Sequence, residues 1–250
     1  MANLFENLEI DETIEVEEQT VRKEITWIKD TGAYTVAVSM FRFGESDGGA
    51  QFFEITLETK DGAKISEKEY FSSKAGKTTY AVKDRATGAL TGDHKDLPGM
   101  AKLKSISRSL TGDPVDWMKN SETKIIPIYN FDKKADIDTE CTVFVGALGQ
   151  EAEILVQRTL YDKDEPNAAG KYVPVAKVVA RSEIVAWLDP VTHKTYSESA
   201  SGSEAKSYEQ FQANLASNPV KDKRKLSKGV DANAPAAPSA PSEEAKNAFS

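Results

Sequence analysis

Aromatic residues alternate with lysine and arginine at several places along this chain of 250 residues. Flat rings on an exposed sheet can stack against unpaired bases, and neighbouring cations can neutralise phosphates. The pattern therefore favours binding of single-stranded nucleic acid. The residues that carry it are Phe41, Arg42, Phe43, Lys68, Tyr70, Lys74, Lys77, Tyr80, Lys83, Arg85, Arg158, Tyr161, Lys171 and Tyr172.

An aromatic residue on a strand is more often part of the core than of a binding surface. Phe41 and Phe43 share a strand face with small and polar residues, so exposure and burial are about equally expected for them. Tyr80 lies in a basic stretch that contains glycine and is predicted to be exposed. The aromatic residues predicted to be buried are Tyr34, Phe53 and Trp187.

Residues typical of catalytic and metal sites are scarce. His94 and His193 lie in polar, turn-like stretches and are predicted to be solvated rather than catalytic or zinc-binding. The acids around Asp162 do not match a calcium-binding loop, so a solvated loop tip is expected there. Neither a GxxxxGK[ST] phosphate loop nor a GxGxxG dinucleotide motif is present. We therefore expect a binding protein, not an enzyme, with no cofactor and no metal.

The net charge of −8 at first argues against a nucleic-acid partner. The acids, however, gather at the two ends of the chain. Residues 1–20 hold seven acidic residues and no basic one, and residues 229–250 carry a net charge of −2. The residues between these ends are close to neutral, and a local basic groove can still attract phosphates.

The compartment is predicted from what the sequence lacks. Cys141 is the only cysteine and cannot form an internal disulfide, so we expect a small core residue in a reducing compartment. The first residues lack the basic and apolar regions of a signal peptide, and no stretch of about 18 apolar residues is present. These features predict an intracellular protein without a membrane span.

The spacing of apolar residues predicts a mainly β protein. Alternation with a period of two predicts three strands, at 34–43, 51–59 and 64–71, followed by a basic, glycine-containing hairpin excursion. A helical period predicts a helix at 100–110 that ends at Gly112. The helix is followed by a short strand at 124–130 and by a segment at 139–148 that fits either helix or strand. Two long strands are then predicted, at 151–161 and 172–188.

Three strands, a helix and two further strands follow the order of the OB-fold, a five-stranded barrel with a helix between its third and fourth strands. We expect such a barrel over residues 21–200, after an acidic segment at 1–20. Residues 201–228 are expected to hold a short helix and a basic run, Lys221–Lys228, that forms a solvated linker. The Ala/Pro/Ser-rich residues 229–250 are expected to be disordered.

Residues 30–228 resemble the single-stranded DNA-binding proteins of tailed bacteriophages. The similarity lies in the order of short motifs: DGGA at Asp47–Ala50, KAGK followed by Tyr80, LPG at Leu97–Gly99, AGKYVP, and KDKRK. The resemblance implies an OB-fold and sequence-independent protection of single-stranded DNA during phage replication or recombination, in the cytoplasm of the host cell. Replication or recombination proteins are the further partners that it implies.

One feature departs from that resemblance. Many replication single-strand binders end in a strongly acidic tail, whereas Glu243 and Glu244 are the only acids near this C-terminus, with Phe249 next to last. This departure argues against partner recruitment through the tail. Two other functions stay open. One is a structural phage protein that binds no nucleic acid, and the other is a regulator of a host enzyme whose acidic N-terminus mimics nucleic acid.

Overall fold

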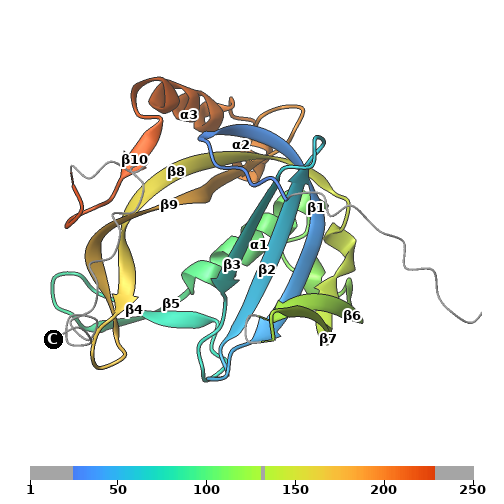
Figure 1. Ribbon diagram of the computed structural model, residues 1–250. Coiled ribbons are helices and arrows are strands. Elements are labelled where there is room, and N and C mark those ends of the chain that lie inside the picture. The colour runs from blue at the N-terminus through green and yellow to red at the C-terminus, as the bar shows by residue number, and fades with distance from the viewer. Residues whose placement is uncertain (1–24, 131–132, 229–250) are drawn as a thin grey trace, which may run out of the picture.

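The computed structural model describes residues 25–130 and 133–228. The predicted acidic segment 1–20 and the predicted tail 229–250 lie outside these residues. The described protein is mainly β, with antiparallel sheets and few helices, as the sequence predicts (Figure 1). No helix in this part of the chain is long and apolar enough to cross a membrane.

Three consecutive strands form an antiparallel meander: β1 (Gly32–Glu45), β2 (Gln51–Thr59) and β3 (Lys64–Tyr70). Gly49 and Gly62 take the positive φ angles that the two connecting turns need. The inner face of β2 carries three fully buried side chains, Phe53, Ile55 and Leu57. The three strands predicted first are thus confirmed, with small differences in their bounds.

A β-bulge in β1 decides which of its rings are buried. The register with β2 shifts between Val38 and Met40 and leaves Ser39 as the extra residue. The predicted alternation is interrupted there, so Phe41 joins the buried face. Phe41 is fully buried and Phe43 is half-buried. Phe41 therefore cannot be the exposed stacking residue that the sequence left open, and it is removed from the candidate site.

A hairpin and a helix follow the meander. β4 (Thr79–Lys83) and β5 (Leu90–Asp96) pair as a separate two-stranded sheet, which is the predicted excursion. α1 (Pro98–Thr111) starts at a proline, and Gly112 follows it in the left-handed conformation with a φ of 81°. Its apolar side packs into the core through Leu103, Ile106 and Leu110. A short 3-10 helix, η1 (Asp116–Met118), follows.

Two further hairpins extend the meander. β6 (Ser121–Asn130) pairs with β7 (Ala135–Phe144), and β7 also pairs with the end of β1. The segment that fitted helix or strand is therefore a strand that ends in a 3-10 turn, η2 (Val145–Ala147). β8 (Glu151–Pro166) pairs with β1 and with β9 (Tyr172–Leu188). β8 continues to Pro166, beyond its predicted end at residue 161.

The C-terminal described segment packs on the outside of β8 and β9. α2 (Tyr196–Ser201) was not predicted, whereas α3 (Lys206–Ser217) was. Phe211 of α3 forms a small second core with Leu155 and Leu188, on the opposite face of the sheet from the main core. This helix therefore covers apolar surface that would otherwise face solvent.

The basic run is held to the sheet. β10 (Val220–Asp222) pairs in parallel with β8. The Asp162 carboxylate then accepts hydrogen bonds from the backbone N–H groups of Lys225, Leu226 and Ser227 and from the Ser227 hydroxyl, at 2.6–3.0 Å. Most of Lys221–Lys228 is exposed, as predicted, but the run is not a free linker, because it is bound to Asp162. Asp162 is not at a loop tip either, because it lies within β8.

The five main strands do not close into a barrel. They lie in the order β9–β8–β1–β2–β3, and β3 and β9 share no backbone pairs among the described residues. Figure 1 shows the long β8–β9 hairpin arching away from the meander, while β4 and β5 lie beneath it. The helix position between β3 and β8 agrees with the prediction, but the predicted barrel closure is not found.

Candidate nucleic-acid interface

Cross-strand pairing brings basic and aromatic side chains together on the outer face of the meander. In one row Phe52 of β2 pairs with Tyr70 of β3, and in the next row Glu54 pairs with Arg42 of β1 and Lys68 of β3. Paired side chains lie on the same face of a sheet. We define the sheet-face cluster as Arg42, Phe52, Lys68, Tyr70 and Lys74.

The two rings of the sheet-face cluster differ in exposure. The Lys68 ammonium nitrogen lies 3.7 Å from the centroid of the Phe52 ring, and the Tyr70 ring meets Phe52 edge-on at 5.7 Å. Gly44 makes room for Phe52, since a Cβ atom there would lie 2.5 Å from Cζ of that ring. Phe52 is 7% exposed and Tyr70 is 47% exposed. Tyr70 is therefore the ring that a base can reach, and Phe52 supports it.

The cations of this cluster differ in their partners. Arg42 forms an ion pair with Glu54. Lys68 and Lys74 form no ion pair with another described residue. Lys74 lies at the β1–β2 turn, where a Cβ atom on Gly48 would be 3.1 Å from its Cε atom. Lys68 on the sheet face and Lys74 beside the β1–β2 turn are both exposed and can contact phosphates.

The β4–β5 hairpin presents a second group of predicted residues. Lys77, Tyr80, Lys83 and Arg85 are all exposed, and Tyr80 pairs across the hairpin with Lys95. Tyr80 is 47% exposed, which confirms the predicted exposure. None of these basic residues forms an ion pair within the part of the chain that the structure describes. We call Lys77, Tyr80, Lys83 and Arg85 the hairpin cluster.

The β8–β9 hairpin carries the remaining predicted residues. Tyr172 is 69% exposed beside Lys171 at the hairpin tip. Arg158, in contrast, lies 3.7 Å from the carboxylate of Asp30. Lys171 and Tyr172 are therefore the members of this group that a ligand can reach. Tyr161 is only partly accessible.

Tyr161 already has several partners. The Lys223 ammonium and the Arg181 guanidinium lie 4.9 and 5.5 Å from the centroid of its ring. Its hydroxyl donates a hydrogen bond to Glu183. Burial acts to raise the pKa of Glu183, but hydrogen bonds from Tyr161 and Thr159 outweigh burial and lower it. Tyr161 therefore links β8 to β9 and to Lys223, which follows β10, and these contacts occupy much of its ring and its hydroxyl.

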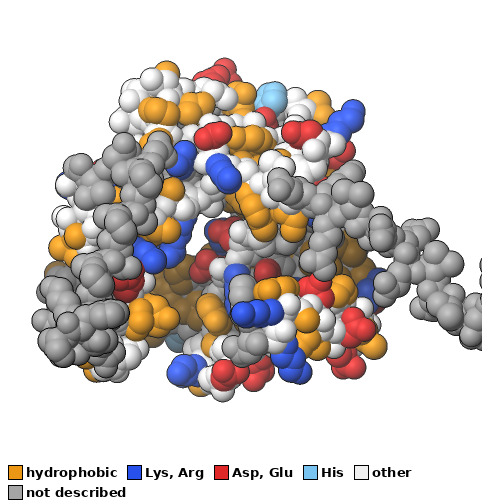
Figure 2. All heavy atoms as spheres, viewed as in Figure 1, with side chains coloured by type: hydrophobic (Ala, Val, Ile, Leu, Met, Phe, Trp, Pro, Cys, Tyr) orange, Lys and Arg blue, Asp and Glu red, His pale blue; other side chains and the backbone are white. Residues whose placement is uncertain are grey.

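The space-filling view shows a hollow between the β8–β9 hairpin and the β1–β3 meander (Figure 2). Lys and Arg side chains lie around this hollow, with several carboxylates among them. The sequence predicts a nearly neutral charge for the residues between the two acidic ends, and around this hollow positive and negative side chains are likewise mixed. A polyanion on this face would meet cations in patches and not a continuous basic surface.

Phe43 lines a cavity next to the sheet-face cluster. Phe71 and Trp117 line it with Phe43, and its volume is about 720 Å³. Phe43 belongs to the main core but is only half-buried. Of the two predicted phenylalanines on β1, Phe43 is therefore the one that a ligand can approach.

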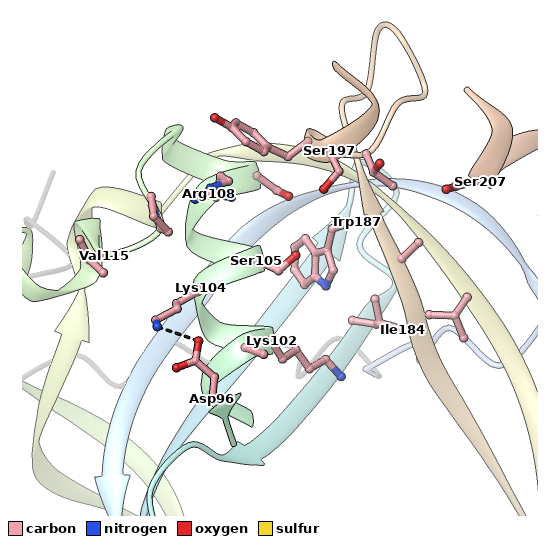
Figure 3. Close-up of a pocket in the computed structure, with 17 residues that line it drawn as sticks. Asp96, Lys102, Lys104, Ser105, Arg108, Val115, Ile184, Trp187, Ser197 and Ser207 are labelled. Atoms are coloured by element: carbon pink, nitrogen blue, oxygen red, sulfur yellow. Dashed lines mark hydrogen bonds and ion pairs between the residues drawn. The ribbon is translucent and has the colours of Figure 1, made fainter. Parts of the chain in front are cut away.

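A second cavity of about 820 Å³ lies between α1, β9 and α2 (Figure 3). The Lys104 ammonium nitrogen lies 2.7 Å from a carboxylate oxygen of Asp96. Lys102 forms an ion pair with Glu67, which does not line the cavity. The Arg108 guanidinium lies 4.8 Å from the centroid of the Tyr196 ring. None of the residues predicted from the sequence to bind nucleic acid lines this cavity.

The two histidines differ in their surroundings. His94 is exposed on β5, as predicted. His193 is not fully solvated, because its Nδ1 atom lies 2.6 Å from the buried Glu153 carboxylate and its ring stacks on Tyr208 at 4.7 Å. Among residues 25–130 and 133–228 no group of three or more His, Cys, Asp and Glu side chains is placed to hold a metal. Cys141 is buried, as predicted.

Sequence reasoning missed Phe52. It stands on the strand face that also carries Glu54, Thr56 and Glu58, so the period-two pattern placed it among solvent-facing residues. The signal that could have found it is Gly44, since an aromatic ring commonly covers a glycine on a neighbouring strand. That pairing becomes visible only when the register of the two strands is known.

No protein-family model matches this chain, and no curated protein matches it.

Proposed function

We propose that this protein binds single-stranded DNA without sequence preference and protects it during phage DNA replication or recombination. The observation that carries the proposal is the sheet-face cluster. It places the exposed Tyr70, the supporting Phe52 and Lys68 on one face of a sheet, with Lys74 beside the β1–β2 turn.

The chemistry of the cluster suits an unpaired strand. Each base that stacks on an exposed ring contributes roughly 1–3 kcal/mol, whichever base it is. Lys68 and Lys74 can neutralise phosphates beside Tyr70, which adds a contribution that weakens as salt increases. In a duplex the faces of the bases are covered by their neighbours. Exposed rings therefore favour single strands over double strands.

The strand order supports the same proposal. β1, β2, β3, α1, β8 and β9 follow one another as in an OB-fold, and we propose that they form an open version of that barrel. OB-folds bind nucleic acids on the face of their second and third strands and with the neighbouring loops. The sheet-face cluster lies on β1–β3, and the hairpin cluster follows β3 directly.

A gel-shift experiment tests the proposal against the two other functions. Oligo(dT) of about 20 nucleotides is long enough for the roughly 4–16 nucleotides that an OB-fold covers. We expect retarded oligo(dT) at low salt and less of it at high salt. A structural phage protein would leave the oligonucleotide unshifted and would self-associate. A nucleic-acid mimic would also leave it unshifted but would bind a host nucleic-acid enzyme.

A further inference from the structure

The cavity beside Phe43 has walls that suit a flat ring. The ring centroids of Phe43 and Trp117 lie 5.5 Å apart, and each lies within 6.0 Å of the Phe71 centroid. The three rings are tilted against one another by 45–83°. All three of these aromatic residues line the cavity. We call this space of about 720 Å³ the aromatic cavity.

The aromatic cavity borders both clusters of the proposed interface. Gly44, which the Phe52 ring covers from the outer face, also lines the cavity. Cys141 lines it too, and its sulfur lies 4.0 Å from a guanidinium nitrogen of Arg42. On another side the lining includes Thr78, which follows Lys77 directly in the chain. A DNA strand that passed from the sheet-face cluster to the hairpin cluster would run past this cavity.

The charges at the cavity determine which part of a DNA strand can enter it. Two of its lining residues are carboxylates, Glu45 and Glu140, and both are exposed. They repel phosphates but not neutral bases. The lysines without an ion pair to another described residue, Lys68, Lys74 and Lys77, lie outside the lining. The backbone of a strand would therefore stay on the surface while an uncharged base turned inward.

We infer that the aromatic cavity receives one unpaired nucleobase of the bound strand, which lies against Trp117 and Phe43. This inference rests on the proposed function and adds to it a specific base-binding pocket. Its volume lies within the roughly 300–1,000 Å³ of pockets that enclose small ligands. The walls supply ring contacts and no cation, so the pocket recognises a base and not a free phosphate.

Tryptophan fluorescence tests the inference, because Trp117 is one of only three tryptophans. The full chain and a Trp117→Phe variant are titrated with oligo(dT) and with an abasic oligonucleotide of equal length. Binding is measured separately, by the anisotropy of a fluorescein label on each strand. Trp117→Phe keeps an aromatic wall and removes an indole nitrogen that is buried without a hydrogen-bond partner among the described residues. The variant is therefore expected to fold.

We expect oligo(dT) to quench the wild-type emission and the abasic strand to bind without this quenching. Trp117→Phe should lose most of the oligo(dT) response. Quenching by the abasic strand that equals quenching by oligo(dT), or undiminished quenching in Trp117→Phe, would overturn the inference. If neither strand changes the anisotropy at low salt, the proposed function itself fails, so the two failures are told apart.

A variant that fills the cavity provides a second readout. Thr142 lines the cavity on β7, and Thr142→Phe would occupy the space meant for the base. Thr142→Val is the matched control, because it keeps the volume and branching of threonine. We expect Thr142→Phe to bind oligo(dT) about 5-fold or more weakly, as for the loss of one stacked base, with an unchanged affinity for the abasic strand. Equal affinities of the two variants for oligo(dT) would contradict the pocket.

Discussion

The carboxylate of Glu54 forms an ion pair with the guanidinium of Arg42 on the outer face of the β1–β3 meander. Glu54 also faces Lys68 across the β2–β3 pairing. It is therefore an acid placed between two cations of the proposed DNA-binding surface. A phosphate that approaches Arg42 must compete with this carboxylate.

We expect Glu54→Gln to tighten the binding of oligo(dT). The change removes one negative charge from the sheet-face cluster and leaves Arg42 free to contact a phosphate. One additional phosphate contact corresponds to roughly a fivefold to tenfold gain at about 0.1 M salt. Anisotropy titrations of a labelled strand measure the change.

Glu58→Gln is the matched control for Glu54→Gln. Glu58 is on the same strand face and pairs with Lys64 at 3.2 Å, toward the other end of the meander. Glu58→Gln changes the net charge by the same amount as Glu54→Gln, but Glu58 lies away from Tyr70. Equal tightening by both variants would show that total charge, and not the sheet-face cluster, governs binding.

Tyr70→Ala is expected to weaken oligo(dT) binding by roughly 1–3 kcal/mol, since it removes the exposed ring of the sheet-face cluster. Its effect on the free energy of unfolding should be smaller, about 0.5–1.5 kcal/mol, because the ring makes one edge-on contact with Phe52. Tyr70→Phe keeps the ring and should bind like the wild type. A Tyr70→Ala variant that binds normally would remove Tyr70 from the interface.

Tyr80→Ala and Lys77→Ala separate stacking from charge in the hairpin cluster. We expect Tyr80→Ala to leave the melting temperature nearly unchanged, because the ring is 47% exposed, and to weaken binding by roughly 1–3 kcal/mol. Lys77→Ala should weaken binding and lower the salt slope by about one unit at most. Thermal melts beside oligo(dT) titrations at several salt concentrations measure both effects. Unfolding of Tyr80→Ala would place its ring in a core instead.

We expect Asp162 to make the stability of the C-terminal described segment depend on pH. Hydrogen bonds from the Ser227 hydroxyl and from the backbone N–H groups of residues 225–227 hold the pKa of this carboxyl well below its usual range. A lowered pKa in the folded state stabilises the protein above the unfolded pKa of about 3.9, and this stabilisation is lost as the pH falls below that value.

We therefore expect Asp162→Asn to melt at a lower temperature than the wild type near pH 7, and the difference to shrink as the pH falls below about 4. Asp164→Asn is the control, since Asp164 is exposed two residues further along β8. A melting-temperature difference for Asp162→Asn that is constant across this pH range would show that the anchoring contacts do not depend on the charge.

The sequence predicted the elements whose local signals agree with their packing. The period-two pattern of Phe53, Ile55 and Leu57 matches a strand with one buried face, and these residues are fully buried. The helix was predicted from the helical spacing of its apolar residues and from Gly112 at its end, and it begins at Pro98, two residues before the predicted start. Tyr80 was predicted to be exposed because few apolar residues surround it in the sequence, and it is exposed.

The rest depends on contacts between distant segments. The bulge at Ser39, which buries Phe41, is set by the pairing of β1 with β2 and has no signature in the alternation itself. The anchoring of the basic run depends on Asp162, more than sixty residues earlier in the chain. Phe52 looked like one apolar residue on a polar face until its register with Gly44 and Tyr70 was known.

The measurement that tests the proposed function most directly compares oligo(dT) with a duplex of equal length, by anisotropy over a range of salt concentrations. The proposed function predicts much tighter binding of the single strand, with an affinity that falls as salt increases. It also predicts that the preference for the single strand declines in a Tyr70→Ala, Tyr80→Ala double variant that remains folded. Equal affinity for single strand and duplex, or no binding of oligo(dT) at low salt, would contradict it.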